Sequence, residues 1–409
     1  MQARPTTHRR GPAIGARFVV LLIVATLIAA ACGDSEETTT TTAGPATTTT
    51  AAATTTTAGE TTTTTAGETT TTTAGETTTT AAAECPEMVP FGWLAGFRIQ
   101  MGAGTPINVA NDQGYYEEEC LEYSEDITTS SASIRLIAAG RWQGGSVSDA
   151  ATLINFVNEG FPLTTVALLS QKSARTFAVL ADSGIETPAD FAGKRVGIKS
   201  NQLWPEFQAM LACVGLTVDD IEQVPVGFSS VELGEDIVDI LPVFSSNEPR
   251  ILREEFGLDI TLIDPQDWCF VSVGTMLLVN TDFAADNPEA VAGFIRATIR
   301  ATEFMLENKD ETLEIVARYA EPEVAENVAQ QSFAYDFTVT AIPRDDGGCL
   351  MTQTQEQWDS QIQQLADLGL LPSPPVTELL YDNRFIDMAY ADLTTCELSD
   401  DPFLKDGVG

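Results

Sequence analysis

Few side chains in this chain are equipped for catalysis, because its only histidine is His8, close to the amino terminus. Without a second imidazole, the rest of the chain cannot form a histidine-activated serine or cysteine nucleophile or a histidine-ligated zinc or iron site. The cysteines also lack the C-x-x-C spacing of metal sites. We therefore expect no enzyme activity, no metal and no cofactor, and interpret the remaining polar and aromatic side chains as candidates for ligand binding.

A carboxylate and two tryptophans stand at positions suited to a planar ligand. Glu248 follows the apolar run Ile240–Phe244 and precedes a proline, so we expect its carboxylate to accept hydrogen bonds from ligand N–H groups. Trp204 and Trp268 offer flat apolar surfaces on which a ring can stack. The alternatives are a solvated loop acid for Glu248 and core packing for the tryptophans.

Hydroxyl, amide and carboxylate side chains stand where helices are expected to begin. Thr105, with Pro106 after it, is predicted to cap a short helix ended by Gly114, and Ser148 to cap another with Asp149 in its first turn. These side chains either cap their helices or donate to a ligand. The candidate ligand residues are Thr105, Ser131, Ser148, Asp149, Ser200, Asn201, Trp204, Asn247, Glu248 and Trp268.

The pattern of elements indicates α/β architecture, because short apolar runs alternate with helical stretches. A long helix is predicted from Asn287, and a mainly helical part follows it to Leu393. In open α/β sheets, ligands bind beyond the carboxyl ends of the strands, so the polar residues above are expected to meet in a cleft. The expected strands are Phe97–Met101, Leu121–Ile127, Gly145–Val147, Leu163–Leu169, Thr176–Leu180, Arg195–Ile198 and Ile240–Phe244.

The amino-terminal residues predict export. Four arginines precede an apolar run from Phe18 to Ala31, so residues 1–31 are interpreted as a signal peptide. The alanines before Cys32 resemble a bacterial lipoprotein cleavage box, which would make Cys32 the acylated first residue; an ordinary signal peptide with a chance cysteine is the alternative. Residues 32–84 consist mainly of Thr, Ala, Gly and Glu and predict a disordered tether, because they offer nothing to bury.

Charge and size narrow the function further. The chain has 21 basic and 59 acidic residues and a net charge of −38, which repels nucleic acid and anionic lipid headgroups. Contact with a membrane is expected through the lipid anchor alone, and the protein is expected to be a monomer. The part from Cys85 to Gly409 is too long for one core, so two domains are expected.

Six further cysteines predict disulfide bonds, since an exported protein folds in an oxidising compartment. They are Cys85, Cys120, Cys213, Cys269, Cys349 and Cys396. Their spacing alone does not choose among the possible pairings.

Several short motifs occur in a characteristic order. They are Gly104-Thr105-Pro106, Gly114 to Glu119, Ala138 to Arg141, Ser183-Gly184-Ile185, Pro188 to Gly197, Asn247-Glu248-Pro249 and Asn287 to Val291. Together they resemble the solute-binding family for thiamine-pyrimidine precursors, nitrate, sulfonates and related compounds.

The resemblance implies an α/β, two-lobed type II periplasmic-binding-protein fold with a ligand cleft between the lobes, preceded by the Thr-rich tether. Lobe I is expected to comprise residues 85–180 and 273–409, and lobe II residues 181–272. The resemblance also implies delivery of a small solute to an ABC permease and ATPase. Because each pair then falls within one lobe, we predict the disulfides Cys85–Cys120, Cys213–Cys269 and Cys349–Cys396.

The expected ligand is heteroaromatic, either a thiamine-pyrimidine precursor or a flavin-like compound. Asn247-Glu248-Pro249 resembles the branch that handles nitrogen heterocycles, whereas Met101 to Gly104 lacks the tryptophan and histidine of the pyrimidine-binding members. The alternatives are nitrate or sulfonate anions, and a surface sensor or adhesin lipoprotein with no transport role.

Overall fold

The computed structural model describes residues 85–95, 102–128, 130–199, 204–227, 230–344, 347–373, 377–393 and 395–396. The predicted signal peptide, Cys32 and the tether lie outside these residues. So do Ser200, Asn201 and the strand expected at Phe97–Met101.

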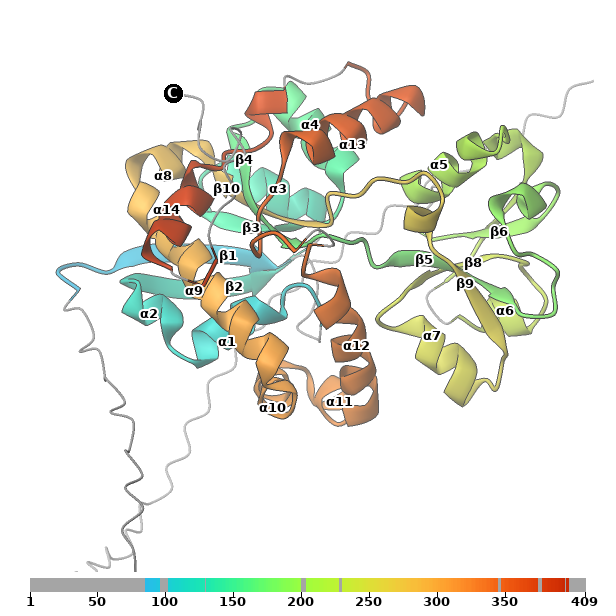
Figure 1. Ribbon diagram of the computed structural model, residues 1–409, viewed down its shortest axis with the longest axis horizontal. Coiled ribbons are helices and arrows are strands. Elements are labelled where there is room, and N and C mark those ends of the chain that lie inside the picture. The colour runs from blue at the N-terminus through green and yellow to red at the C-terminus, as the bar shows by residue number, and fades with distance from the viewer. Residues whose placement is uncertain are drawn as a thin grey trace, which may run out of the picture. The chain divides into compact units, whose positions relative to one another are not determined.

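The chain alternates strands and helices, as predicted (Figure 1). The strands are β1 (Val89–Ala95), β2 (Leu121–Ile127), β3 (Gly144–Val147), β4 (Leu163–Ser170), β5 (Arg175–Leu180), β6 (Arg195–Ile198), β7 (Glu222–Pro225), β8 (Leu241–Phe244), β9 (Ile260–Ile263) and β10 (Thr275–Asn280). The helices that precede β9 are α1 (Thr105–Asp112), α2 (Tyr115–Glu118), α3 (Ser130–Ala138), α4 (Ala150–Asn158), α5 (Pro205–Cys213), α6 (Val231–Gly234) and α7 (Glu248–Arg250). The later helices are α8 (Thr281–Asp286), α9 (Pro288–Glu307), α10 (Lys309–Tyr319), α11 (Pro322–Ala325), α12 (Val328–Ala341), α13 (Gln355–Asp367) and α14 (Arg384–Asp392).

The first lobe is built on a five-stranded sheet of order β2-β1-β3-β10-β4. β1 pairs in parallel with β2 and β3, whereas β10 runs antiparallel to β3 and β4. The carboxyl ends of β1, β2, β3 and β4 therefore lie at one edge of the sheet, together with the amino end of β10.

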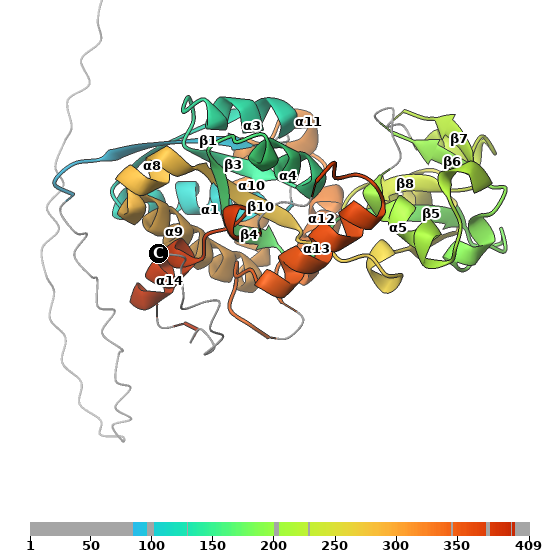
Figure 2. The ribbon, with the colours of Figure 1, turned by 90° about the horizontal axis from the view of Figure 1, so that it is seen from above.

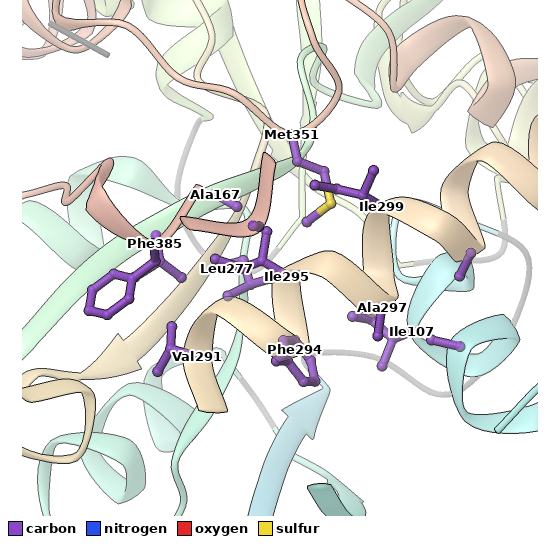
Figure 3. Close-up of a cluster of buried hydrophobic side chains, with 14 of the residues drawn as sticks. Ile107, Ala167, Leu277, Val291, Phe294, Ile295, Ala297, Ile299, Met351 and Phe385 are labelled. Atoms are coloured by element: carbon purple, nitrogen blue, oxygen red, sulfur yellow. The ribbon is translucent and has the colours of Figure 1, made fainter. Parts of the chain in front are cut away.

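Alternating side chains of this sheet supply two cores. Leu277 and Val279 of β10 face one cluster, which includes residues of α1, α9 and α14, while Met276 and Leu278 face another, which includes α3, α4 and α13. In the first cluster, Phe294 of α9 lies among apolar side chains of the sheet and of α1 (Figure 3). Figure 2 shows α3 and α4 on the face opposite α9 and α14.

The second lobe has a sheet of order β8-β5-β9, and the pair β6-β7 joins it through a parallel bridge between Val196 and Ile240. Phe177 and Val179 of β5 face one core with α5, and Ala178 faces a second core. Figure 1 shows β5, β8 and β9 side by side, with α5, α6 and α7 around them.

The lobe boundary predicted at Leu180 is wrong, because the structure places the first crossing earlier. β5 pairs with β8 and β9 along Arg175–Leu180 and so belongs to the second lobe. A buried apolar strand has the same residue pattern in either sheet, so the sequence does not show which strands β5 pairs with. The chain crosses between the lobes at residues 171–174 and again between Ile263 and Thr275.

Two predicted helix caps are also wrong. Gly104, not Thr105, is the N-cap of α1; Thr105 is its first residue, and its Oγ1 accepts a hydrogen bond from the Gly102 N–H at 2.9 Å. Asp149, not Ser148, caps α4, because its carboxylate accepts from the Thr152 N–H at 3.0 Å and the Thr152 hydroxyl at 2.9 Å. A carboxylate fills the N-cap role as well as a hydroxyl does.

All three predicted disulfides are confirmed: Cys85–Cys120, Cys213–Cys269 and Cys349–Cys396. Within the residues that the structure describes, no helix is long and apolar enough to span a bilayer. The same residues contain no group of three or more His, Cys, Asp or Glu side chains placed to hold a metal ion.

Candidate functional site

The polar ends of the second sheet gather at one edge. Arg175, at the start of β5, pairs with Phe244, at the end of the antiparallel strand β8. β6 runs parallel to the chain entering β8, so Lys199 after β6 and Glu248 after β8 leave the sheet at this same edge. The two crossings also begin here, which places this edge next to the first lobe.

An aromatic and charged cluster stands at the amino end of α5, within this edge. Trp204 immediately precedes the helix and packs against Phe177 and Phe244, with ring centroids 5.8 and 5.4 Å apart. The Arg175 guanidinium lies over the indole, its Cζ 5.2 Å from the ring centroid. Arg175 Nη1 donates to both carboxylate oxygens of Glu206, at 3.2 and 3.4 Å. We call Arg175, Trp204 and Glu206 the α5 cluster.

The facing wall comes from the first lobe. The hydroxyls of Ser148, after β3, and Thr275, at the start of β10, are 3.1 Å apart, and Asp149 follows with its carboxylate engaged in capping α4. A cavity between the lobes touches both walls. Its lining includes Ser148 and Asp149 from the first lobe, Arg175 and Glu206 from the second, and Phe270 from the crossing. Its volume of about 20 Å³ holds roughly one water molecule, so a larger ligand requires the lobes to separate.

Glu248 lies in a buried ion pair. Its Oε1 accepts from Lys199 Nζ at 2.7 Å, and its Oε2 accepts from the Phe244 N–H at 2.8 Å. The side chains of Lys199 and Glu248 are 1% and 3% exposed. The alternative interpretation of Glu248 as a solvated loop acid is therefore wrong, and the role of Glu248 toward a ligand stays a prediction.

Asn247 joins the two lobes. Gln330 of α12 donates from Nε2 to the Asn247 side-chain oxygen at 3.2 Å and to the Ser246 carbonyl at 3.1 Å. Arg250 Nη1 donates to Gln330 Oε1 at 3.3 Å. Asn247, predicted to touch a ligand, thus also takes part in a contact between α12 and α7.

The other predicted residues are spread over the fold. Thr105 is buried at the start of α1, Ser131 lies in α3, and Trp268 is partly buried against the core that includes α5. Nearby, burial raises the pKa of Asp264, whose carboxylate caps the turn before Trp268. Of the predicted residues, the structure brings Ser148 and Asp149 close to the α5 cluster, which includes Trp204.

Arg175 and Glu206 were not predicted. Arg175 starts a largely apolar and buried strand, and a guanidinium at the first residue of such a strand is a signal that the sequence offers. Glu206 resembles an ordinary first-turn acid of α5 and gives no such signal. The pairing of β5 with β8, together with the bridge from β6 to the chain entering β8, brings these two side chains together.

The second crossing is fixed from both lobes. The disulfide Cys213–Cys269 ties it to the end of α5, while Gln364 of α13 donates to the Cys269 carbonyl and accepts from the Val271 N–H at 3.2 Å. A cavity of about 630 Å³ lies beside this disulfide, between α5 and α13. The crossing is thus held by one covalent bond and one side-chain amide.

Comparison with known proteins places the chain in a family. Residues 103–312, more than half of the chain, match the family described as NMT1/THI5 like. The chain belongs to this family. It is 25% identical over 287 residues to the formylaminopyrimidine-binding protein of Halalkalibacterium halodurans, covering 67% of this chain and 84% of the relative. It is also 25% identical over 298 residues to the riboflavin-binding protein RibY of Chloroflexus aurantiacus, covering 69% and 82%.

Another relative is named as an enzyme. The 4-amino-5-hydroxymethyl-2-methylpyrimidine phosphate synthase of Legionella pneumophila is 23% identical over 303 residues, covering 71% of this chain and 90% of the relative. Binding proteins and a synthase therefore occur among the relatives of this chain.

Solved structures confirm the fold. The periplasmic sulfonate-binding protein SsuA from Methylobacillus flagellatus has a TM-score of 0.57 at 15% identity, covering 75% of this chain and 95% of that protein. The periplasmic nitrate-binding protein NrtA from Synechocystis gives 0.53 at 13% identity, covering 76% and 90%. The predicted two-lobed periplasmic-binding-protein fold is thus shown.

Proposed function

We propose that this protein is the extracytoplasmic substrate-binding component of an ABC importer and captures a small planar heterocycle between its lobes. The observation that carries the proposal is the α5 cluster, in which an indole and a buried carboxylate stand next to the crossings of a two-lobed fold. An indole stacks on planar rings, and a carboxylate accepts from their N–H groups. The relatives named as binding proteins for formylaminopyrimidine and riboflavin support the choice of a heterocycle.

The charges around the cavity favour a heterocycle over nitrate or a sulfonate. Two carboxylates, Asp149 and Glu206, line it together with one guanidinium, Arg175, which Glu206 already pairs. An anion would meet a net negative wall in a chain of net charge −38. A ring with N–H donors would find acceptors there instead.

Calorimetry on the wild-type protein tests the binding role. We expect an aminopyrimidine or riboflavin to bind and sodium nitrate and methanesulfonate to give no heat. Binding of the anions alone would replace the heterocycle with an anionic substrate.

Enzyme activity is the second candidate, because a relative is a synthase. The chain from Cys32 onward has no histidine, which favours binding without turnover. Mass spectrometry of ligand recovered after prolonged incubation should show an unchanged mass. A modified ligand would make the protein an enzyme.

We further propose that Cys32 is acylated and anchors the protein at the outer face of the membrane, where a permease collects the solute. The leader ending at Ala31 supports this anchor. Cys32→Ser should release the protein into the medium. If this variant stays with the membrane fraction, the lipid anchor is refuted.

A further inference from the structure

The α5 cluster holds a carboxylate that is almost fully buried but incompletely paired. The Glu206 side chain is 6% exposed, and the hydrogen bonds to it within the described residues come from one nitrogen of Arg175. The two distances, 3.2 and 3.4 Å, are longer than the roughly 2.7–2.9 Å of a charge-assisted bond. A carboxylate can accept two parallel N–H bonds from a fork, whereas within the described residues Glu206 accepts from Arg175 Nη1 alone.

The same guanidinium covers the stacking surface. Arg175 lies over the indole of Trp204, while the neighbouring rings of Phe177 and Phe244 are tilted against that indole and fix it in place. A planar ligand cannot stack on the face of Trp204 that Arg175 occupies. The Arg175 side chain is 21% exposed, so it has room to leave toward solvent, whereas Glu206 does not.

We propose that Arg175 occupies the place of the ligand, and that the site selects a planar group carrying an amidine edge, meaning two parallel N–H donors on two nitrogens bonded to the same carbon. This inference rests on the proposed function and names its substrate class. Such an edge is present in amidinium groups and in amino-substituted nitrogen heterocycles whose ring nitrogen is protonated. Displacing Arg175, the ligand stacks on Trp204 and donates two bonds to Glu206.

The proposal makes Arg175 a competitor of the ligand. A residue that contacts the ligand directly would weaken binding when removed, whereas a competitor strengthens it. Benzamidine is a suitable probe, since it is planar and presents two parallel N–H donors. Benzamide has the same shape with one of the two donors of that edge replaced by a carbonyl oxygen, and so serves as the matched control ligand.

Calorimetry on the secreted protein compares four variants with wild type. We expect Arg175→Ala to bind benzamidine about tenfold more tightly, and Glu206→Gln about tenfold more weakly, than wild type. Arg175→Lys keeps the charge without the planar fork and should fall between wild type and Arg175→Ala. Arg135→Ala removes an exposed guanidinium 5.5 Å from the Phe156 ring centroid in the first lobe and should match wild type. Benzamide should bind weakly in all of them.

Several results would overturn the proposal. They are unchanged or weaker benzamidine binding by both Arg175 variants, full binding by Glu206→Gln, and no benzamidine binding by any variant. The proposed function fails separately, if wild type binds none of the heterocycles while Arg175→Ala still gains affinity for benzamidine. Conversely, wild type that binds an aminopyrimidine without any gain in Arg175→Ala retains the proposed function and rejects the self-occupied site.

Discussion

At the scale of single residues, the Lys199–Glu248 pair separates a structural role from a ligand-binding role. Both side chains are almost fully buried, so removing one partner takes away the main counter-charge of the other. Breaking a buried pair in this way costs about 3–5 kcal/mol, whereas replacing both partners with apolar residues of similar size is often neutral. The stability of single and double variants therefore reports what the pair does.

We predict that Glu248→Ala lowers the free energy of unfolding by about 3–5 kcal/mol in urea denaturation, and that Lys199→Met with Glu248→Leu loses much less. Asp336→Ala breaks the exposed pair with Lys309 and should cost under about 1 kcal/mol. If Glu248→Ala instead keeps the stability of wild type and loses ligand affinity, Glu248 is a ligand residue first.

Asp387 gives the fold a pH dependence of identifiable sign. Burial, with a smaller effect of the Asp382 charge, raises the pKa of Asp387 to about 6. Its Oδ1 is buried without a hydrogen-bond partner in the described part of the chain, although Arg384 pairs with the nearby Asp382. Since the ordinary pKa is 3.8, the folded state binds more protons than the unfolded state between about pH 4 and 6.

The contribution of Asp387 to the free energy of unfolding of wild type should therefore fall as pH rises through that window. Asp387→Asn should remove this fall and be more stable than wild type at pH 7, as measured by thermal unfolding at half-unit steps from pH 4 to 7. A difference between Asp387→Asn and wild type that stays constant from pH 4 to 7 would contradict the prediction.

At the scale of elements, the disulfide Cys213–Cys269 lies in the crossing from β9 to β10, where it can restrict lobe motion. Cys213–Cys269 and Cys349–Cys396 close loops of similar length, with separations of 56 and 47 residues. Loop entropy alone assigns each about 4 kcal/mol. If removing either disulfide lowers the stability equally, but only removal of Cys213–Cys269 changes the dynamics of the crossing, then Cys213–Cys269 has a specific role there.

We predict that replacing Cys213 and Cys269 with alanine accelerates hydrogen exchange at the Val271 amide, which donates to Gln364, by at least about tenfold. The matched variant without Cys349 and Cys396 should lose similar stability in urea and keep the exchange rate of Val271. Equal acceleration in both variants would mean that global destabilisation, not the hinge bond, controls this amide.

The elements show what the sequence could predict. β2 and β6 occupy the predicted ranges Leu121–Ile127 and Arg195–Ile198, because alternation and flanking turn residues are local signals. β1 was missed because Pro90 and Gly92 disfavour a strand, yet it pairs with both β2 and β3. The lobe that receives β5 depends on partners distant in sequence, which local patterns do not encode.

The distinction between local signals and contacts distant in sequence also explains which site residues could be predicted. Trp204 was predicted as a flat apolar surface for a planar ligand, and the disulfides from the lobes that the resemblance implied. Arg175 and Glu206 are 31 residues apart and meet only through sheet pairing. The ion pair of Glu248 could not be predicted for the same reason, because Lys199 follows a different strand.

At the scale of the whole molecule, a net charge of −38 makes self-repulsion a general term in stability. Added salt screens it, since the Debye length shortens from about 30 Å at 0.01 M to about 8 Å at 0.15 M. We predict that the melting temperature rises over this range in NaCl and rises equally in choline chloride. A rise in NaCl alone would indicate a specific sodium site, and a fall would show that favourable ion pairs outweigh repulsion.

The disulfide between Cys85 and Cys120 has a mechanical consequence. Cys85 is four residues before β1, and Cys120 immediately precedes β2, the parallel neighbour of β1 at the sheet edge. Traction on the chain before Cys85 is therefore shared between two adjacent strands loaded in shear, and does not peel β1 away alone. A domain pulled from its amino-terminal side, as by drag on a tethered protein, would yield only when both strands slide together.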